Sequence, residues 1–223
     1  ECFKKLGVSI EIKAGQIYID GKGKYALKAP GQLLYTGNSG TTTRLLCGLL
    51  APQSFSATLD GDASIRKRPM KRVIEPLMKM GAKISGSNGD YTPITIEGTE
   101  LKEIEYTMPV ASAQLKSALI LAGLYVQGKT TIIEPKLSRN HTELMVNGFG
   151  GEVTVENNII IVNPGKELFG QKIEIPGDIS SAAFFIVAAL IIPNSEIRIK
   201  NVGLNETRTG IIDVLRAMGA FIA

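Results

Sequence analysis

An internal repeat constrains the fold of this 223-residue chain more than any other feature. Four apolar-glycine turns are spaced by 74, 69 and 69 residues, and each follows an amphipathic stretch and precedes an alternating one; they end in Gly7, Gly81, Gly150 and Gly219. Hairpin-turn signals recur at the same spacing, at Ala14-Gly15, Asn88-Gly89 and Asn157-Asn158. Self-similarity of this kind indicates a fold built from copies of one supersecondary unit. We therefore predict three units, 8–81, 82–150 and 151–219.

Each unit shows the same order of segments after its hairpin. After the hairpin, a third extended stretch is expected to end at a proline, which is Pro30, Pro109 or Pro176. A cluster of small residues and serine follows, at 38–40, 111–113 and 179–181. An apolar helix comes next, at 42–50, 114–126 and 182–192, and then a strand and an amphipathic helix. Pro76 lies inside one of these last helices, so we expect that helix to be kinked or broken.

The hydrophobic pattern predicts which elements are buried and which have a face exposed to solvent. The strands alternate apolar and polar residues, as in 8–13 and 152–156, so one face of each sheet is expected to be exposed. The helices after the serine clusters are apolar nearly all round, which is typical of buried helices. The predicted fold class is α/β, with three repeated βαβαββ units, helices buried at the centre and mixed sheets outside. We expect residues 1–223 to form a single domain.

Composition excludes several classes of protein. Hydrophobic residues make up 44% and charged residues 21%, which is typical of globular proteins. The longest apolar run, 182–192, is too short to span a bilayer, so no membrane partner is expected. One histidine and two cysteines exclude a His-cluster metal site, a zinc site and a disulfide framework, and they fit a cytoplasmic protein. The net charge of +4 permits an anionic ligand without indicating nucleic acid.

The starts of the three apolar helices are the main candidate sites. At Asn38-Ser39-Gly40, the free N–H groups and the helix dipole favour an anion, and Gly40 would allow close approach. The alternative is that serine or asparagine simply caps the helix. Ser112 and Gln114, at the second start, also allow two interpretations. Ser112 could bind a phosphate and Gln114 a substrate hydroxyl. Alternatively, Ser112 caps the helix and Gln114 is a buried amide with its hydrogen bonds satisfied. At the third start, Asp178 replaces any anion and is expected to be the cap.

Each unit also carries an arginine in the loop before its last helix. These are Arg68, Arg139 and Arg208, spaced by 71 and 69 residues. An arginine beside a helix start can bind a carboxylate or phosphate in bidentate fashion. The alternative for the basic run 66–72 is a solvated face or a non-specific nucleic-acid patch, and Arg66 and Lys67 are expected to be solvated. His141 is expected to be a capping or structural residue, and Cys47 an inert residue of a buried helix.

Together these motifs resemble the 5-enolpyruvylshikimate-3-phosphate (EPSP) synthase family over the whole chain, and in particular its bacterial, glyphosate-tolerant class. The segments that carry the resemblance are 37–41, Gly61-Asp62 with 67–70, 109–118, 139–143, 176–182 and 205–210. The family fold has two domains of three βαβαββ units each, with ligands bound between them. The resemblance therefore implies that this chain is one domain of two, that its start and end are cut, and that the other domain is a required partner.

The resemblance also implies a function. The family transfers the enolpyruvyl group of phosphoenolpyruvate to the 5-hydroxyl of shikimate-3-phosphate, in the shikimate pathway to chorismate and aromatic amino acids, without a cofactor. By resemblance, Gly40 and Arg68 contact phosphoenolpyruvate. The resemblance also implies that shikimate-3-phosphate is contacted by Ser112, Ala113, Gln114 and Arg139, with Ser138 a further candidate. The family's proton-transferring residues match nothing in this chain, so no catalytic residue is assigned, and we expect the chain alone to be inactive. The full enzyme is expected to be monomeric.

Two other functions are alternatives to this one. UDP-N-acetylglucosamine enolpyruvyl transferase shares the fold but carries a reactive cysteine before the Arg-Pro pair, and residues 61–65 contain none. A nucleic-acid-binding module could use the run 66–72, but aromatic residues make up only 6% of the chain and none is interleaved with that run.

Overall fold

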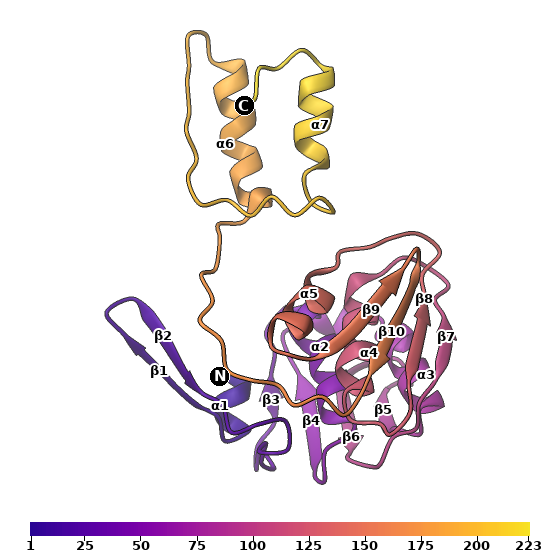
Figure 1. Cartoon of the computed structure of the whole chain (residues 1–223). Coiled ribbons are helices and arrows are strands. Elements are labelled where there is room, and N and C mark those ends of the chain that lie inside the picture. The colour runs from indigo at the N-terminus through magenta and orange to yellow at the C-terminus, as the bar shows by residue number, and fades with distance from the viewer. The chain divides into compact units, whose positions relative to one another are not determined.

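The computed structural model describes all 223 residues, in two compact units, Glu1–Gly170 and Gln171–Ala223 (Figure 1). The helices of the first unit are α1 (Cys2–Lys5), α2 (Gly40–Leu50), the 3-10 helix η1 (Ile65–Lys67), α3 (Lys71–Lys79), α4 (Ala113–Gly123) and α5 (His141–Gly148). Its strands are β1 (Ser9–Lys13), β2 (Gln16–Asp20), β3 (Leu34–Tyr35), β4 (Ser56–Asp60), β5 (Lys83–Ser87), β6 (Tyr91–Glu97), β7 (Glu105–Thr107), β8 (Thr130–Ile133), β9 (Glu152–Glu156) and β10 (Ile159–Asn163). The second unit contains α6 (Ile179–Ile191) and α7 (Gly210–Ala217).

The two four-stranded sheets have the same topology. One has the order β3-β4-β6-β5 and the other β7-β8-β10-β9. In each, two strands that flank a buried helix pair in parallel, and the antiparallel hairpin of the next predicted unit completes the sheet. The sheets are therefore mixed, and burial alternates along β6 and β8 so that one face packs inward. The predicted α/β class with mixed outer sheets is confirmed.

The repeated glycines end helices in the same way. Gly7, Gly81, Gly150 and Gly219 all have a positive φ, between +86° and +94°. At the first, the amide of Gly7 donates to Lys4 and the amide of Val8 donates to Phe3, at 3.0 and 2.9 Å. The same two bonds recur after α3, α5 and α7. This is the Schellman pattern, which needs a left-handed residue that glycine adopts without strain.

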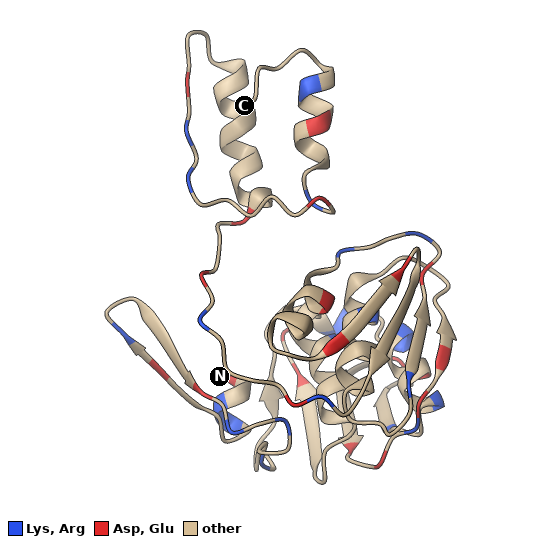
Figure 2. Cartoon of the chain, viewed as in Figure 1, with Lys and Arg blue, Asp and Glu red and all other residues tan.

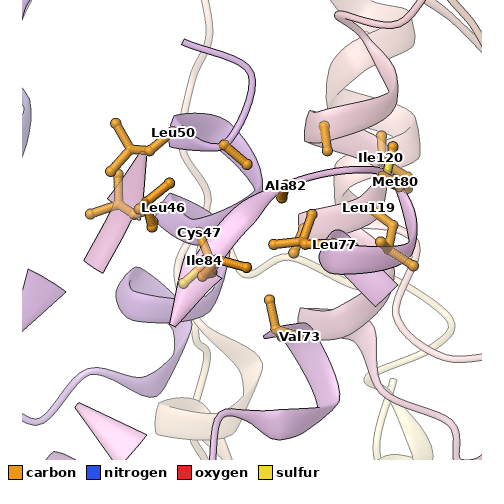
Figure 3. Close-up of a cluster of buried hydrophobic side chains, with 14 of the residues drawn as sticks. Leu46, Cys47, Leu50, Val73, Leu77, Met80, Ala82, Ile84, Leu119 and Ile120 are labelled. Atoms are coloured by element: carbon orange, nitrogen blue, oxygen red, sulfur yellow. The ribbon is translucent and has the colours of Figure 1, made fainter. Parts of the chain in front are cut away.

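The core of the first unit lies between its helices. Figure 3 shows side chains from α2, α3, β5 and α4 in one cluster; those labelled include Leu46, Cys47, Val73, Leu77, Ile84 and Leu119. Helices α2 and α4 touch backbone to backbone, because a Cβ on Gly48 would lie 2.1 Å from the carbonyl oxygen of Ala118. Burial of both helices confirms the predicted helical centre for this unit.

Two local predictions were wrong, and a third was wrong in part. The third strand of the first repeat does not end at Pro30; the structure has its counterpart, β3, after that proline. Helix α3 is not broken at Pro76, since it runs from Lys71 to Lys79, and a kink at that residue stays a prediction. Proline has no N–H, so Pro76 cannot donate to the carbonyl oxygen of Arg72 in the first turn. The helix therefore lacks one hydrogen bond close to its N-terminus. In the third repeat the two strands around the apolar helix shrink to one parallel bridge between Gly177 and Val202.

Helix α6 also departs from expectation. It is apolar and carries no charged residue, as Figure 2 shows, yet it buries only Ile179 and Ala182. Phe184 is 80% exposed and Ile191 is 75% exposed. The expectation of a buried third helix is therefore not met within this chain. The chain divides into two compact units, and the single domain spanning 1–223 stays a prediction. No helix of the chain is long and apolar enough to span a bilayer.

We predict that Gly48→Ala destabilises the first unit. The added methyl group would overlap a backbone carbonyl of α4, so the two helices would have to separate, at a cost of about 1–3 kcal/mol. Urea unfolding followed by circular dichroism measures the change. Gly148→Ala is the control, since nothing lies within 4 Å of its added Cβ and its φ is not positive; alanine there should be neutral or stabilising by up to about 1 kcal/mol. Equal stability of both variants would contradict the close crossing.

Candidate anion-binding site at two helix starts

The start of α2 is both capped and open. Ser39 is the N-cap, and its hydroxyl accepts from the amide of Thr42 at 3.1 Å. Gly40, the first helical residue, is buried, and a Cβ there would lie 2.8 Å from Nη1 of Arg44 and 3.4 Å from Nη1 of Arg68. Glycine at this position therefore leaves room for two guanidinium groups beside the helix start. Free amides, the positive end of the helix dipole and two cations meet at one place, which favours an anion.

Three arginines gather at this start without a carboxylate between them. Arg44 donates to neutral oxygens, the side-chain Oε1 of Gln114 at 2.5 Å and the backbone oxygen of Pro69 at 3.3 Å. Arg68 and Arg72 are exposed and make no ion pair. Burial, and then the charges of Arg68 and Arg72, lower the pKa of the Arg44 guanidinium. Such mutual repulsion would be relieved by a bound carboxylate or phosphate.

Gln114 joins the start of α4 to the start of α2. Its Oε1 accepts from Arg44, and its Nε2 donates to Oγ1 of Thr41 at 2.7 Å. One turn further along both helices, Gly48 meets Ala118. Contacts at Arg44–Gln114 and then at Gly48–Ala118 mean that the two helices run in the same direction and begin at the same end. Two helix N-termini, each a potential anion site, therefore lie next to each other.

The start of α4 has the arrangement predicted from the sequence. Ser112 is the N-cap, and its hydroxyl accepts from the amide of Leu115 at 3.4 Å. Ala113 is the first residue of the helix. The capping reading of Ser112 is thus confirmed, and capping leaves the hydroxyl proton of Ser112 free to donate to a ligand.

The segment between β8 and α5 carries Ser138 and Arg139. Arg139 is exposed and makes no hydrogen bond or ion pair, so its guanidinium is free to bind a ligand. Ser138 donates to the buried carboxylate of Glu134 through both its hydroxyl and its amide. Its donors are therefore occupied by protein, and only the lone pairs of its hydroxyl face other partners. His141 is exposed and begins α5.

The third repeat shows the same arrangement filled by the protein's own carboxylate. Asp178 is the N-cap of α6, as predicted, and accepts from the amide of Ser180 at 3.0 Å. Arg208 lies 3.7 Å from Asp178 and also donates to the Ser180 hydroxyl. Hydrogen bonds from the amide of Ser180 lower the pKa of Asp178. Arginine beside a helix start thus binds a carboxylate in this fold, and here that carboxylate belongs to the chain.

Two sequence-based assignments change with the structure. Arg66 is exposed, as expected, with 56% of its side chain accessible, but it is not an unpaired charge: its guanidinium forms a two-point ion pair with Asp60, whose side chain is 6% exposed. Arg44 was not assigned to the site from sequence. Its position four residues after Gly40, one helical turn away, was the available signal. Cys47 is fully buried, and burial raises the pKa of its thiol to about 12, which confirms that it is inert.

Comparison with known proteins shows which family this chain is similar to. A family model described as EPSP synthase (3-phosphoshikimate 1-carboxyvinyltransferase) matches residues 1–223. A 3-phosphoshikimate 1-carboxyvinyltransferase of Thermoanaerobacter sp. (strain X514) is 57% identical over 99% of this chain and 52% of its own length. The protein of that name from Bacillus subtilis (strain 168) is 54% identical, with the same coverage. The chain spans about half the length of the curated relatives it matches.

Solved structures agree with these relatives. The EPSP synthase from Acinetobacter baumannii superimposes with a TM-score of 0.91 at 47% sequence identity. The match covers 98% of this chain and 50% of that one. The likeness therefore extends to the fold of nearly the whole chain.

We predict that the Arg66–Asp60 pair makes stability depend on pH. Hydrogen bonds from Arg66 lower the pKa of Asp60, so its ionised form stabilises the fold above the unfolded pKa of about 3.9. That contribution is lost as the pH falls through the lowered folded pKa. Urea unfolding should therefore show Arg66→Met less stable than the parent at pH 7, with a smaller difference near about pH 3. Lys67→Met, an exposed charge without a partner, should show no such trend. A difference that stays constant with pH would contradict the pair.

Proposed function

Because the chain belongs to the EPSP synthase family, we propose that it supplies a substrate-binding half of an enzyme that transfers the enolpyruvyl group of phosphoenolpyruvate to the 5-hydroxyl of shikimate-3-phosphate. The observation that carries the proposal is the Gln114 bridge. One side chain contacts the starts of both α2 and α4, so two anion sites lie close enough for two anionic substrates to react.

Phosphoenolpyruvate is assigned to the start of α2. Gly40 leaves the backbone amides accessible, and Arg68 lies beside them with a free guanidinium. Phosphoenolpyruvate carries a carboxylate and a phosphate, and each can accept two parallel hydrogen bonds from an arginine. Arg44 adds a second cation and at the same time fixes the orientation of Gln114.

Shikimate-3-phosphate is assigned to the start of α4. Ser112 and Ala113 provide a hydroxyl and a helix N-terminus for its phosphate or carboxylate. Gln114 stands between the two ligands, and Arg139 offers a free guanidinium from the neighbouring loop. Ser138 remains a proposed contact through its hydroxyl lone pairs, which can accept from a substrate hydroxyl.

The assigned residues bind and orient; they do not transfer the protons. In the reaction, the 5-hydroxyl oxygen adds to the substituted alkene carbon while the terminal carbon gains a proton. The intermediate then loses phosphate and a proton, and the enol ether remains. Two anions repel each other in water, so the arginines and helix starts lower the cost of bringing the hydroxyl to the alkene. The proton-transferring groups are expected from the rest of the enzyme, which we propose as the chain's partner, in a monomeric cytoplasmic protein that needs no cofactor.

We predict that Arg68→Ala weakens phosphoenolpyruvate binding at least about tenfold, since a hydrogen bond to a charged group contributes roughly 1.5–3 kcal/mol. Arg68→Lys should recover only part of this loss, because lysine keeps the charge but not the two-point geometry. Isothermal titration with phosphoenolpyruvate measures both. Lys67→Ala is the matched control, an exposed neighbouring cation without a partner, and should change little. Equally mild effects of Arg68→Ala and Lys67→Ala on phosphoenolpyruvate binding would contradict this assignment and favour the alternative, in which residues 66–72 form a solvated basic face.

A second prediction separates the two ligands. Arg139→Ala should weaken shikimate-3-phosphate about tenfold and leave phosphoenolpyruvate unchanged, because it removes one charge-assisted contact from one ligand only. Lys136→Ala, an exposed cation three residues earlier in the same segment, is the control. The same titrations with each ligand in turn decide the assignment. Loss of both ligands in the Arg139 variant, or of neither, would overturn it.

A further inference from the structure

A buried ion cluster lies directly behind the proposed shikimate-3-phosphate site. The side chain of Lys116, in the first turn of α4, is 2% exposed. Its Nζ lies 2.8 Å from Oε2 of Glu134 and 2.7 Å from Oε1 of Glu143. Both carboxylates are buried as well, at 0% and 3% exposure for the two residues. Three charged side chains thus share one enclosed place beneath the segment that bears Arg139.

This cluster is a costly way to fill a core. Taking each ion out of water costs several kcal/mol, and replacing a buried ion pair by apolar residues of similar volume is often neutral or stabilising. The helix positions around Lys116 are apolar and buried, among them Leu115 and Leu119. The two carboxylates outnumber the one cation, and Oε2 of Glu143 has no hydrogen-bond partner. Stability alone would favour apolar residues at all three positions, since removing Lys116 by itself would leave two buried carboxylates unpaired.

The cluster instead connects the substrate segment to α4. Glu134 follows β8, and it accepts from Lys116 and from both donors of Ser138. Glu143 lies in the first turn of α5 and accepts from the same Lys116. Beside it, the hydroxyls of Ser117 and Thr142 are 2.6 Å apart. The segment 134–143 is therefore fastened to α4 at both of its ends.

We propose that Lys116, Glu134 and Glu143 are positioning residues, which fix the Arg139 segment relative to the start of α4 so that shikimate-3-phosphate meets a preorganised pair of surfaces. Lys116 lies two residues after Gln114 on one rigid helix, so holding the segment to Lys116 also sets it against Gln114. Preorganisation of this kind saves the cost of ordering the loop on binding. The inference rests on the proposed function for the identity of the ligand, but the ordering of the segment does not depend on it.

The decisive variant replaces the whole cluster, Lys116→Met with Glu134→Met and Glu143→Met. Because all three charges leave together, urea unfolding should show stability equal to or above that of the parent. Backbone order parameters of residues 137–141 should nevertheless fall from about 0.85 to below about 0.6. Affinity for shikimate-3-phosphate should drop about tenfold, as expected when one charge-assisted contact is no longer held in place, while affinity for phosphoenolpyruvate stays unchanged. A stable triple variant with an ordered segment and undiminished shikimate-3-phosphate affinity would overturn the proposal.

The variant Glu134→Gln tests the same proposal if the triple variant does not fold. Oε2 of Glu134 accepts from Lys116 and from the amide of Ser138, and Oε1 accepts from the hydroxyl of Ser138. Glutamine keeps the volume, but it has one acceptor oxygen in place of two and no negative charge to pair with Lys116. The segment should loosen and shikimate-3-phosphate affinity should fall; an unchanged order parameter would contradict the proposal. Failure of the proposed function would look different. In that case the parent itself would not bind shikimate-3-phosphate, while the order parameters would still report whether the cluster holds the segment.

Discussion

Helices α2 and α4 approach so closely at Gly48 that no side chain fits between their backbones. This crossing sets the geometry of everything around it. It brings the two helix starts together, it places Arg44 within reach of Gln114, and it leaves the sheets as outer walls that cover the helices. An extra methyl group at the crossing would therefore act at a distance, by separating two anion sites that depend on adjacent helix starts.

Much of this arrangement could be predicted from the sequence because it is local and repeated. The four glycine stops and the caps at Ser39, Ser112 and Asp178 each depend on residues within one helical turn. The repeat then made each local inference stronger, since the same signal occurred in equivalent places. The two four-stranded sheets with one topology are the structural expression of that repeat.

What could not be predicted depends on partners that are distant in the sequence. Lys116 was one charge in an otherwise apolar helix, and its partners at Glu134 and Glu143 come from two other elements. Arg66 was one cation in a basic run, and only the fold shows that Asp60 lies beneath it. The prediction that helix α6 is buried was wrong for the opposite reason. Its composition indicates burial, but the residues needed to cover Phe184 and Ile191 do not pack on it within this chain.

The pairing of Arg208 with Asp178 gives the third helix start a different status from the other two. A carboxylate tethered in the same chain acts at an effective concentration of about millimolar or higher. A dissolved metabolite present at lower concentration cannot displace it, so this copy is silent towards free anions. An acidic residue at this helix start thus makes the arginine part of an internal tether, where the other two starts are proposed to bind ligands.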